Sequence, residues 1–199
     1  MKKIFWVLFA VMGLSLLLSG CASAPTEEIT ATTDALKAIE TPDVNTYAPD
    51  SLKAAQDELN KALAEVKVQD EKFALTRDYK QAVALLKSTK ELVEKAKNDA
   101  QANKAQAKAD AEAAIAALPP IMEEATAMLA KAPRGKDTKA DLEAMQNDLK
   151  LAEEAAAEAN NAMFTEQYKD ALAKANTAKE KAMAITEQVK AARAKLGKR

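Results

Sequence analysis

Few residues in this chain have side chains that act as nucleophiles, metal ligands or proton carriers. Cys21 is the only cysteine, and the 199 residues include no histidine. Nucleophilic catalysis that pairs serine or cysteine with histidine is therefore excluded, as are zinc and haem sites built from these residues. A disulfide within the chain is impossible, because Cys21 has no second cysteine to pair with.

Carboxylates are the remaining groups with acid–base chemistry. Those that could in principle form paired acids are Asp78, Glu123, Glu124, Glu153 and Glu154. On helices rich in lysine and glutamate, however, such residues usually form solvated faces with weak ion pairs. We therefore predict that the protein is not an enzyme and binds no cofactor or metal.

The residues before Cys21 indicate why a single cysteine is present. Two lysines near the start are followed by an uncharged apolar run at 4–18, and then by Ser19 and Gly20. This order is typical of a secretory signal. The run is shorter than the roughly 18 apolar residues that a membrane span needs. We expect residues 1–20 to be removed as a signal peptide.

Leu18-Ser19-Gly20-Cys21 resembles the lipobox of bacterial lipoproteins, in which cleavage falls just before the cysteine. The resemblance implies a diacylglycerol thioether on Cys21 and an acyl chain on its freed amine. Two or three chains hold a protein at a membrane, whereas one chain binds marginally at about 0.8 kcal/mol per buried methylene. Ala22 and Ser23 resemble an outer-membrane sorting signal. A buried or free thiol is the alternative for Cys21.

Composition predicts an all-α fold. About a quarter of the residues are alanine, the strongest helix former, and after residue 20 the only glycines are Gly135 and Gly197. Without residues 1–20, the chain keeps 27 of its 29 basic residues against 30 acids. This balance offers no basic face to nucleic acid, so no nucleic-acid partner is expected.

Prolines mark the boundaries between the expected helices, since proline breaks a helix interior but fits its first turn. They are Pro25, Pro42, Pro49, the pair Pro119-Pro120 and Pro133. The predicted order is a tether with a short helix at 21–46, a helical hairpin at 47–118, a connecting short helix and turn at 119–136, and a second hairpin at 137–199.

Apolar residues recur at helical spacing along both arms of the first hairpin. The first arm is expected to bury Leu52, Ala55, Leu59, Ala62, Val66 and Phe73. The second arm, with Thr76 as its candidate cap, is expected to bury Tyr79, Val83, Leu86, Val93 and Ala100. It continues to Leu118 through an alanine-rich part, which buries little area and is predicted to be weakly stable or covered by a partner.

The two halves of the chain share a sequence pattern. "TRDYKQAVALLKSTKE" from Thr76 matches "TEQYKDALAKANTAKE" from Thr165, and "SLKAAQDEL" from Ser51 matches "DLEAMQNDL" from Asp141. The pattern predicts elongated antiparallel hairpins related by internal duplication, with a period of about 90 residues. Chance similarity between alanine-rich helices is the alternative explanation.

Aromatic residues lie at both expected hairpin bends: Phe73 and Tyr79 at the first, Phe164 and Tyr168 at the second. They are candidates for an aromatic groove that grips a partner, as buried tyrosines do at interfaces. The other interpretation is that the tyrosines plug the bundle where each second helix begins, on its apolar stripe.

Residues 21 to about 100 resemble a family of uncharacterised bacterial lipoproteins. The resemblance is carried by "YAPDSLKAAQDELNKA", a Tyr-Ala-Pro-acidic start, and by "DYKQAVALLKSTKELVEKAKNDA", an Asp-Tyr-x-x-Ala second helix. Members are similar in outline to tetratricopeptide hairpins and often precede an OmpA-like peptidoglycan-binding domain, which this sequence does not contain. The resemblance implies a coiled, helical envelope lipoprotein.

These features together predict a lipid-anchored, non-enzymatic helical scaffold or protein-binding module, held at the outer membrane and facing the periplasm. The alternative is a mechanical spacer between outer membrane and peptidoglycan. Expected partners are the membrane, through Cys21, and an envelope protein or peptidoglycan; a homo-oligomer is left open. By analogy with the major murein lipoprotein, whose terminal lysine is joined to peptidoglycan, Lys198 is a candidate wall attachment.

Overall fold

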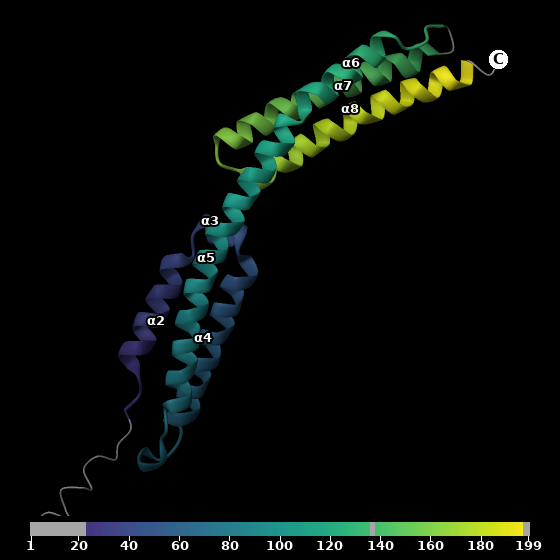
Figure 1. Ribbon diagram of the computed structural model, residues 1–199. Coiled ribbons are helices and arrows are strands. Elements are labelled where there is room, and N and C mark those ends of the chain that lie inside the picture. The colour runs from purple at the N-terminus through teal and green to yellow at the C-terminus, as the bar shows by residue number, and fades with distance from the viewer. Residues whose placement is uncertain (1–22, 136–137, 197–199) are drawn as a thin grey trace, which may run out of the picture. The chain divides into compact units, whose positions relative to one another are not determined.

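The computed structural model describes residues 23–135 and 138–196, which form helices and no strand (Figure 1). The helices are α2 (Thr26–Ile39), α3 (Pro42–Tyr47), α4 (Pro49–Asp70), α5 (Lys80–Ala116), α6 (Leu118–Ala130), α7 (Lys139–Phe164) and α8 (Tyr168–Leu196), with a short 3-10 helix, η2 (Ala74–Thr76), between α4 and α5. The all-α prediction is confirmed.

Prolines begin the helices where the sequence predicts. Pro42 and Pro49 occupy the first positions of α3 and α4, where a missing N–H costs nothing. The Thr41 hydroxyl caps α3 by accepting from the Val44 N–H at 3.3 Å. Pro119 and its neighbour lie in the first turn of α6, so α5 ends at Ala116 and a new helix starts.

The described chain divides into two compact units, and the division falls inside α5. Unit 1, Met1–Gln101, contains α2, α3, α4 and the first part of α5. Unit 2, Ala102–Arg199, contains the end of α5 together with α6, α7 and α8. The boundary therefore lies within the segment 47–118 that the sequence pattern assigns to one hairpin. The internal duplication stays a prediction.

The core of unit 1 lies between α4 and α5, and α2 packs beside them (Figure 1). The buried stripes are Leu52, Ala55, Leu59, Ala62 and Val66 on α4, and Ala82, Leu86, Val93, Ala96 and Ala100 on α5. Thr89 lies within this stripe, and its hydroxyl donates to the Leu85 carbonyl at 2.8 Å, which satisfies a buried polar group. The two helices run antiparallel. Ser51 at the start of α4 donates to the Asp99 carboxylate, and Val66 near the end of α4 packs with Ala82 at the start of α5.

Two expected core residues of unit 1 are exposed. Phe73 is 72% exposed, because α4 ends at Asp70 and the seven-residue spacing has no meaning beyond the helix. Val83 is 42% exposed, because the buried stripe of α5 runs through Ala82 and Leu86, one position to its side.

Unit 2 has a thin alanine layer at one end and a core of larger residues at the other. The thin layer consists of Ala155, Ala159 and Ala162 on α7 and Ala171, Ala175 and Ala178 on α8. At the other end, Met145, Ile185 and Val189 pack with Met122 and Leu129 of α6. The Arg193 guanidinium donates to the Lys131 carbonyl at 2.8 Å and so satisfies the end of α6.

The alanine-rich end of α5 is covered in part by this chain itself. Ala111 is fully buried and packs with Ala162 and Ala171 at the bend between α7 and α8. Small side chains let these three helices approach closely. Met145 of α7 is buried in the core of unit 2, whereas Met183 of α8 is exposed.

Candidate functional site

The two residues predicted to carry covalent attachments, Cys21 and Lys198, lie outside the described residues. The described residues begin at Ser23, and α2 begins at Thr26. The four aromatic candidates are all described, and they lie at the two bends that join α4 to α5 and α7 to α8. Each of these two bends is therefore treated as a candidate site of its own unit.

Side chains hold the first bend together. The Arg77 guanidinium donates to the carbonyls of Asp70 at 2.7 Å and Lys72 at 3.1 Å. The side-chain amide oxygen of the buried Gln69 accepts from the Asp78 N–H and from the Lys72 ammonium, each at 3.0 Å. These bonds satisfy the Asp70 carbonyl at the end of α4 and tie residues 77 and 78 back to that end.

Asp78, and not Thr76, caps α5. The Asp78 carboxylate accepts from the Lys80 N–H at 3.0 Å, and this backbone hydrogen bond holds the pKa of the carboxyl below its ordinary value. The Thr76 hydroxyl instead donates to the Phe73 carbonyl at 2.8 Å, within η2. The predicted cap was two residues too early, because both residue types are good caps and the turn decides between them.

Tyr79 is buried in unit 1, with 5% of its surface exposed. Its ring packs with Val66 and Ala82, and with Ala24 and Ile29 at the start of α2. Its hydroxyl donates to the Asp70 carboxylate. Hydrogen bonding to that carboxylate, more than burial, raises the pKa of Tyr79.

Backbone hydrogen bonds hold the second bend. The Gln167 N–H donates to the Ala162 carbonyl at 2.8 Å, and the Glu166 N–H donates to the Met163 carbonyl at 3.2 Å. This pairing is a Schellman motif, which needs a left-handed residue after the helix. Glu166 fills that position with φ of 58°, where glycine is usual.

Tyr168 begins α8 and is 7% exposed. The Lys104 ammonium lies 5.9 Å from the centre of its ring, within the range of a cation–π contact. The same ammonium pairs with the Glu166 carboxylate at 3.0 Å. The end of α5 is thereby joined to the bend of α7 and α8.

The two phenylalanines face solvent, unlike the tyrosines. Phe164 is 90% exposed and Phe73 is 72% exposed, and Leu75 beside Phe73 is 68% exposed. At each bend the tyrosine is buried and the phenylalanine is exposed, which agrees with the interpretation of the tyrosines as plugs. Sequence reasoning missed Leu75; its signal was an apolar residue placed between the cations of a short turn.

The candidate catalytic carboxylates do not gather into a reactive cluster. Asp78 caps a helix, and the others are exposed on helix surfaces, where Glu154 pairs with Lys150 at 3.7 Å. Among residues 23–135 and 138–196, no group of three or more cysteine, histidine, aspartate or glutamate side chains is placed to hold a metal ion. The arrangement of these carboxylates suggests solvation.

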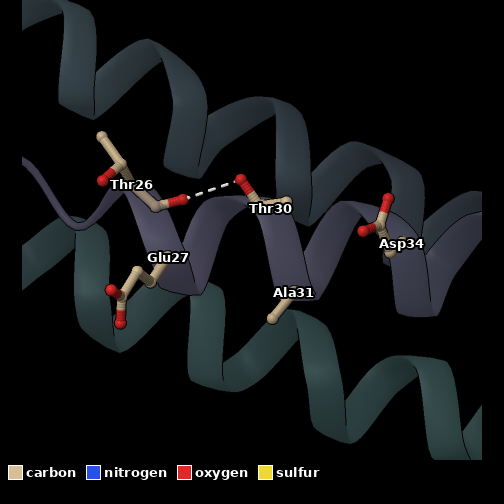
Figure 2. A pocket seen from close by; sticks show the side chains of 5 residues that line it. All are labelled: Thr26, Glu27, Thr30, Ala31 and Asp34. Carbon is tan, nitrogen blue, oxygen red and sulfur yellow. Dashed lines mark hydrogen bonds between the residues drawn. The ribbon is translucent and has the colours of Figure 1, made fainter.

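A shallow depression lies along the exposed side of α2 (Figure 2). It is lined by Thr26, Glu27, Thr30, Ala31 and Asp34. The Thr30 hydroxyl donates back to the Thr26 carbonyl at 2.9 Å, within the same helix. All five residues come from one helix and none is buried, so the depression does not enclose a ligand.

One helical stretch of the described chain, Lys80–Ala130, is long and apolar enough for a membrane span by length and composition alone. This is weak evidence for a span. The stretch is broken into α5 and α6 around Ala117, and Leu118 and Ala125 are buried in the core of unit 2.

No protein-family model, curated protein or solved structure matches this chain. Its function must therefore be inferred from its own residues. The two bends and the segment that precedes α2 offer the most specific features.

Proposed function

We propose that the chain is a lipid-anchored, non-enzymatic helical scaffold of the bacterial cell envelope. The observation that carries the proposal is Leu18-Ser19-Gly20-Cys21, which follows an uncharged apolar run and precedes the start of α2 by five residues. Acyl chains on Cys21 would hold the helical body at the outer-membrane surface, and its exposed helix faces would meet a partner in the periplasm.

Lipidation of Cys21 is tested by labelling growing cells with an alkyne analogue of palmitate. We expect the wild-type chain to carry the label and to sediment with membranes. Cys21→Ser should lose the label, because the serine hydroxyl cannot form the thioether. Ser19→Ala is the matched control, since it keeps a small residue in the motif and should stay labelled. An unlabelled wild-type chain would overturn the proposal.

Phe164 is the residue through which we propose to test partner binding. Its side chain is 90% exposed, so Phe164→Ser removes apolar surface without removing core contacts. If the bend of unit 2 binds an envelope protein or peptidoglycan, this variant should fail to restore envelope integrity in cells that lack the wild-type chain. Lys150→Ser, at another exposed position of α7, is the matched control.

The length of α5 favours the second candidate function, a mechanical spacer. Its 37 residues extend about 55 Å as one helix. Inserting seven alanine-rich residues between Gln101 and Ala102 lengthens α5 by about 10 Å and changes its helical phase by only about 20°. Because the compact units divide there, neither unit loses a residue.

The two functions give opposite results with these variants. A spacer should be impaired by the insertion and unaffected by Phe164→Ser, whereas a binding module should show the reverse. Wall attachment through Lys198 is a separate proposal, tested by mass spectrometry of digested cell walls. The absence of a cross-linked Lys198 peptide, in walls where the murein lipoprotein peptide is found, would remove it.

A further inference from the structure

We propose that the tip of the first bend, residues Lys72–Arg77, is a second membrane contact that inserts Phe73 and Leu75 into the lipid surface beside the anchor. The inference rests on the proposed lipidation of Cys21. It adds to that proposal a defined orientation of unit 1 at the membrane. The observations that support it are the exposure and charge of the tip, and its distance from the start of the chain's helical body.

The six-residue tip exposes two large apolar side chains to solvent. Phe73 and Leu75 are 72% and 68% exposed, and Val68 on the last turn of α4 is half exposed. Exposed large apolar side chains that lie together mark sites for a partner or a membrane. An aromatic and an aliphatic side chain at a tip match the lipid interface, where apolar groups of bound proteins enter about 5–10 Å.

The charges of the tip also suit a lipid surface. "KFALTR", residues 72–77, contains two cations and no acid. The neighbouring acids Asp70, Glu71 and Asp78 balance Lys72, Arg77 and Lys80, so residues 70–80 carry no net charge and the two cations of the tip are the charges beside its apolar side chains. Cations flanking apolar residues are attracted by the anionic headgroups of a bilayer.

The tip lies at the end of unit 1 that the lipid anchor can reach. Ala24 and Ile29 pack with Val66, Tyr79 and Ala82, so the start of α2 is held against the bend (Figure 1). Cys21 precedes Ala24 by three residues, which span at most about 11 Å in any conformation. A lipid on Cys21 would therefore enter the membrane close to the tip.

The opposite end of unit 1 is too far from the bend to contact the membrane beside the lipid anchor. α4 is 22 residues long, so its first residue, Pro49, lies about 30 Å along the helix from the bend. The bonds of Arg77 to the carbonyls of Asp70 and Lys72 close the base of the tip and so restrict the segment that carries Phe73 and Leu75. Phe73 and Leu75 are thus presented without an additional ordering cost.

The test uses tryptophan as a depth probe in the full chain. The natural chain has one tryptophan, Trp6, within the segment proposed to be removed, so Phe73→Trp places a single fluorophore at the tip. The variant is purified from membranes and reconstituted into phosphatidylethanolamine–phosphatidylglycerol vesicles whose acyl chains carry bromine. Lys53→Trp is the matched control, exposed on α4 about 25 Å from the end of that helix.

We expect the emission of the Phe73→Trp variant to shift to the blue and to be quenched by the brominated lipid, while the emission of the Lys53→Trp variant is neither shifted nor quenched. A membrane-bound Phe73→Trp chain whose emission is unquenched overturns the membrane contact and leaves the lipid anchor intact. A blue shift without quenching also overturns it, and indicates burial against protein, such as a second copy.

A chain that carries no lipid and does not float with vesicles overturns the proposed function, and this inference with it. The two failures are thus distinguished by flotation. Leu75→Trp is the second variant, used if circular dichroism finds Phe73→Trp misfolded, and the same quenching is expected from it because Leu75 is similarly exposed. Quenching at position 75 supports the contact, and its absence in a floating chain overturns it.

Discussion

The bend between α4 and α5 takes up residues 71–79, whereas the bend between α7 and α8 takes up only residues 165–167. The first depends on side chains, with Arg77 and Gln69 satisfying backbone groups. The second depends on the backbone, at the cost of a left-handed Glu166. Both place a tyrosine in the core and a phenylalanine in solvent.

The difference shows what a longer bend adds. A three-residue bend has room only to close the helix end and begin the next helix. The longer bend can carry a segment whose apolar side chains are mostly exposed, and in unit 1 these are Phe73 and Leu75. Its side-chain bonds keep the segment ordered. The bends therefore share a structural role in their tyrosines and differ in what they offer to other molecules.

The largest expected effect comes from truncating the buried tyrosines. Tyr168→Ala should lower the free energy of unfolding by about 3 kcal/mol or more, as aromatic truncations in cores do. Tyr79→Ala should also be strongly destabilising, because it leaves the Asp70 carboxylate without its donor. Urea unfolding followed by circular dichroism measures both.

Phe73→Ala and Phe164→Ala are the controls for this comparison. Both side chains are exposed, so each change should stay within about 0.5 kcal/mol. If the phenylalanine variants lost as much stability as the tyrosine variants, the division into plugs and exposed residues would be wrong.

The next largest loss of stability should come from a substitution in the first bend. Arg77→Ala removes two hydrogen bonds to backbone carbonyls and should lower the free energy of unfolding by about 1–2 kcal/mol. Arg77→Lys keeps the charge but not the forked donors, and should recover less than half of the loss. Full recovery by lysine, measured in the same urea experiment, would mean that charge and not geometry holds the bend.

Glu166→Gly should stabilise the second bend. Glycine adopts positive φ without the clash of a Cβ atom, and the gain should be about 0.5–1 kcal/mol after loss of the ion pair with Lys104. Glu166→Gln isolates that ion pair, which should contribute at most about 0.5 kcal/mol. A thermal midpoint lower for the glycine variant than for the glutamine variant would contradict this account.

The smallest effect is a pH dependence specific to the first bend. Because the Asp70 hydrogen bond raises the pKa of Tyr79 above 10.0, its contribution to stability is present below pH 10.0 and is lost as pH rises through the raised pKa. Absorbance of tyrosinate should show a late-titrating component that is absent in Tyr79→Phe. Asp70→Asn should make that titration earlier; an unchanged curve would exclude the carboxylate as the cause.

Much of the fold follows from local sequence signals. Pro42 and Pro49 start helices because their fixed φ suits a first turn, and the seven-residue spacing of Leu52 and Leu59 identifies the buried face of α4. The end of α4 is different. It is set by side chains that return from residues 77–79, and that contact is distant enough to leave no periodic signal.

The bends could be predicted only in part. Burial of Tyr79 and Tyr168 agrees with their position on the apolar stripes of α5 and α8. Exposure of Phe73 could not be read from the sequence, because its spacing continued a pattern whose helix had already ended. Nor could the left-handed residue after α7, since Glu166 carries none of the preference that marks a glycine at such a position.

The alanine layer between α7 and α8 also determines how this protein should respond to temperature. Alanine methyl groups expose little apolar area when helices separate, and apolar area is the source of the heat-capacity increase on unfolding. A small heat-capacity increase flattens the curve of stability against temperature. The bend end of unit 2 should therefore have modest maximal stability that changes little between cold and warm conditions.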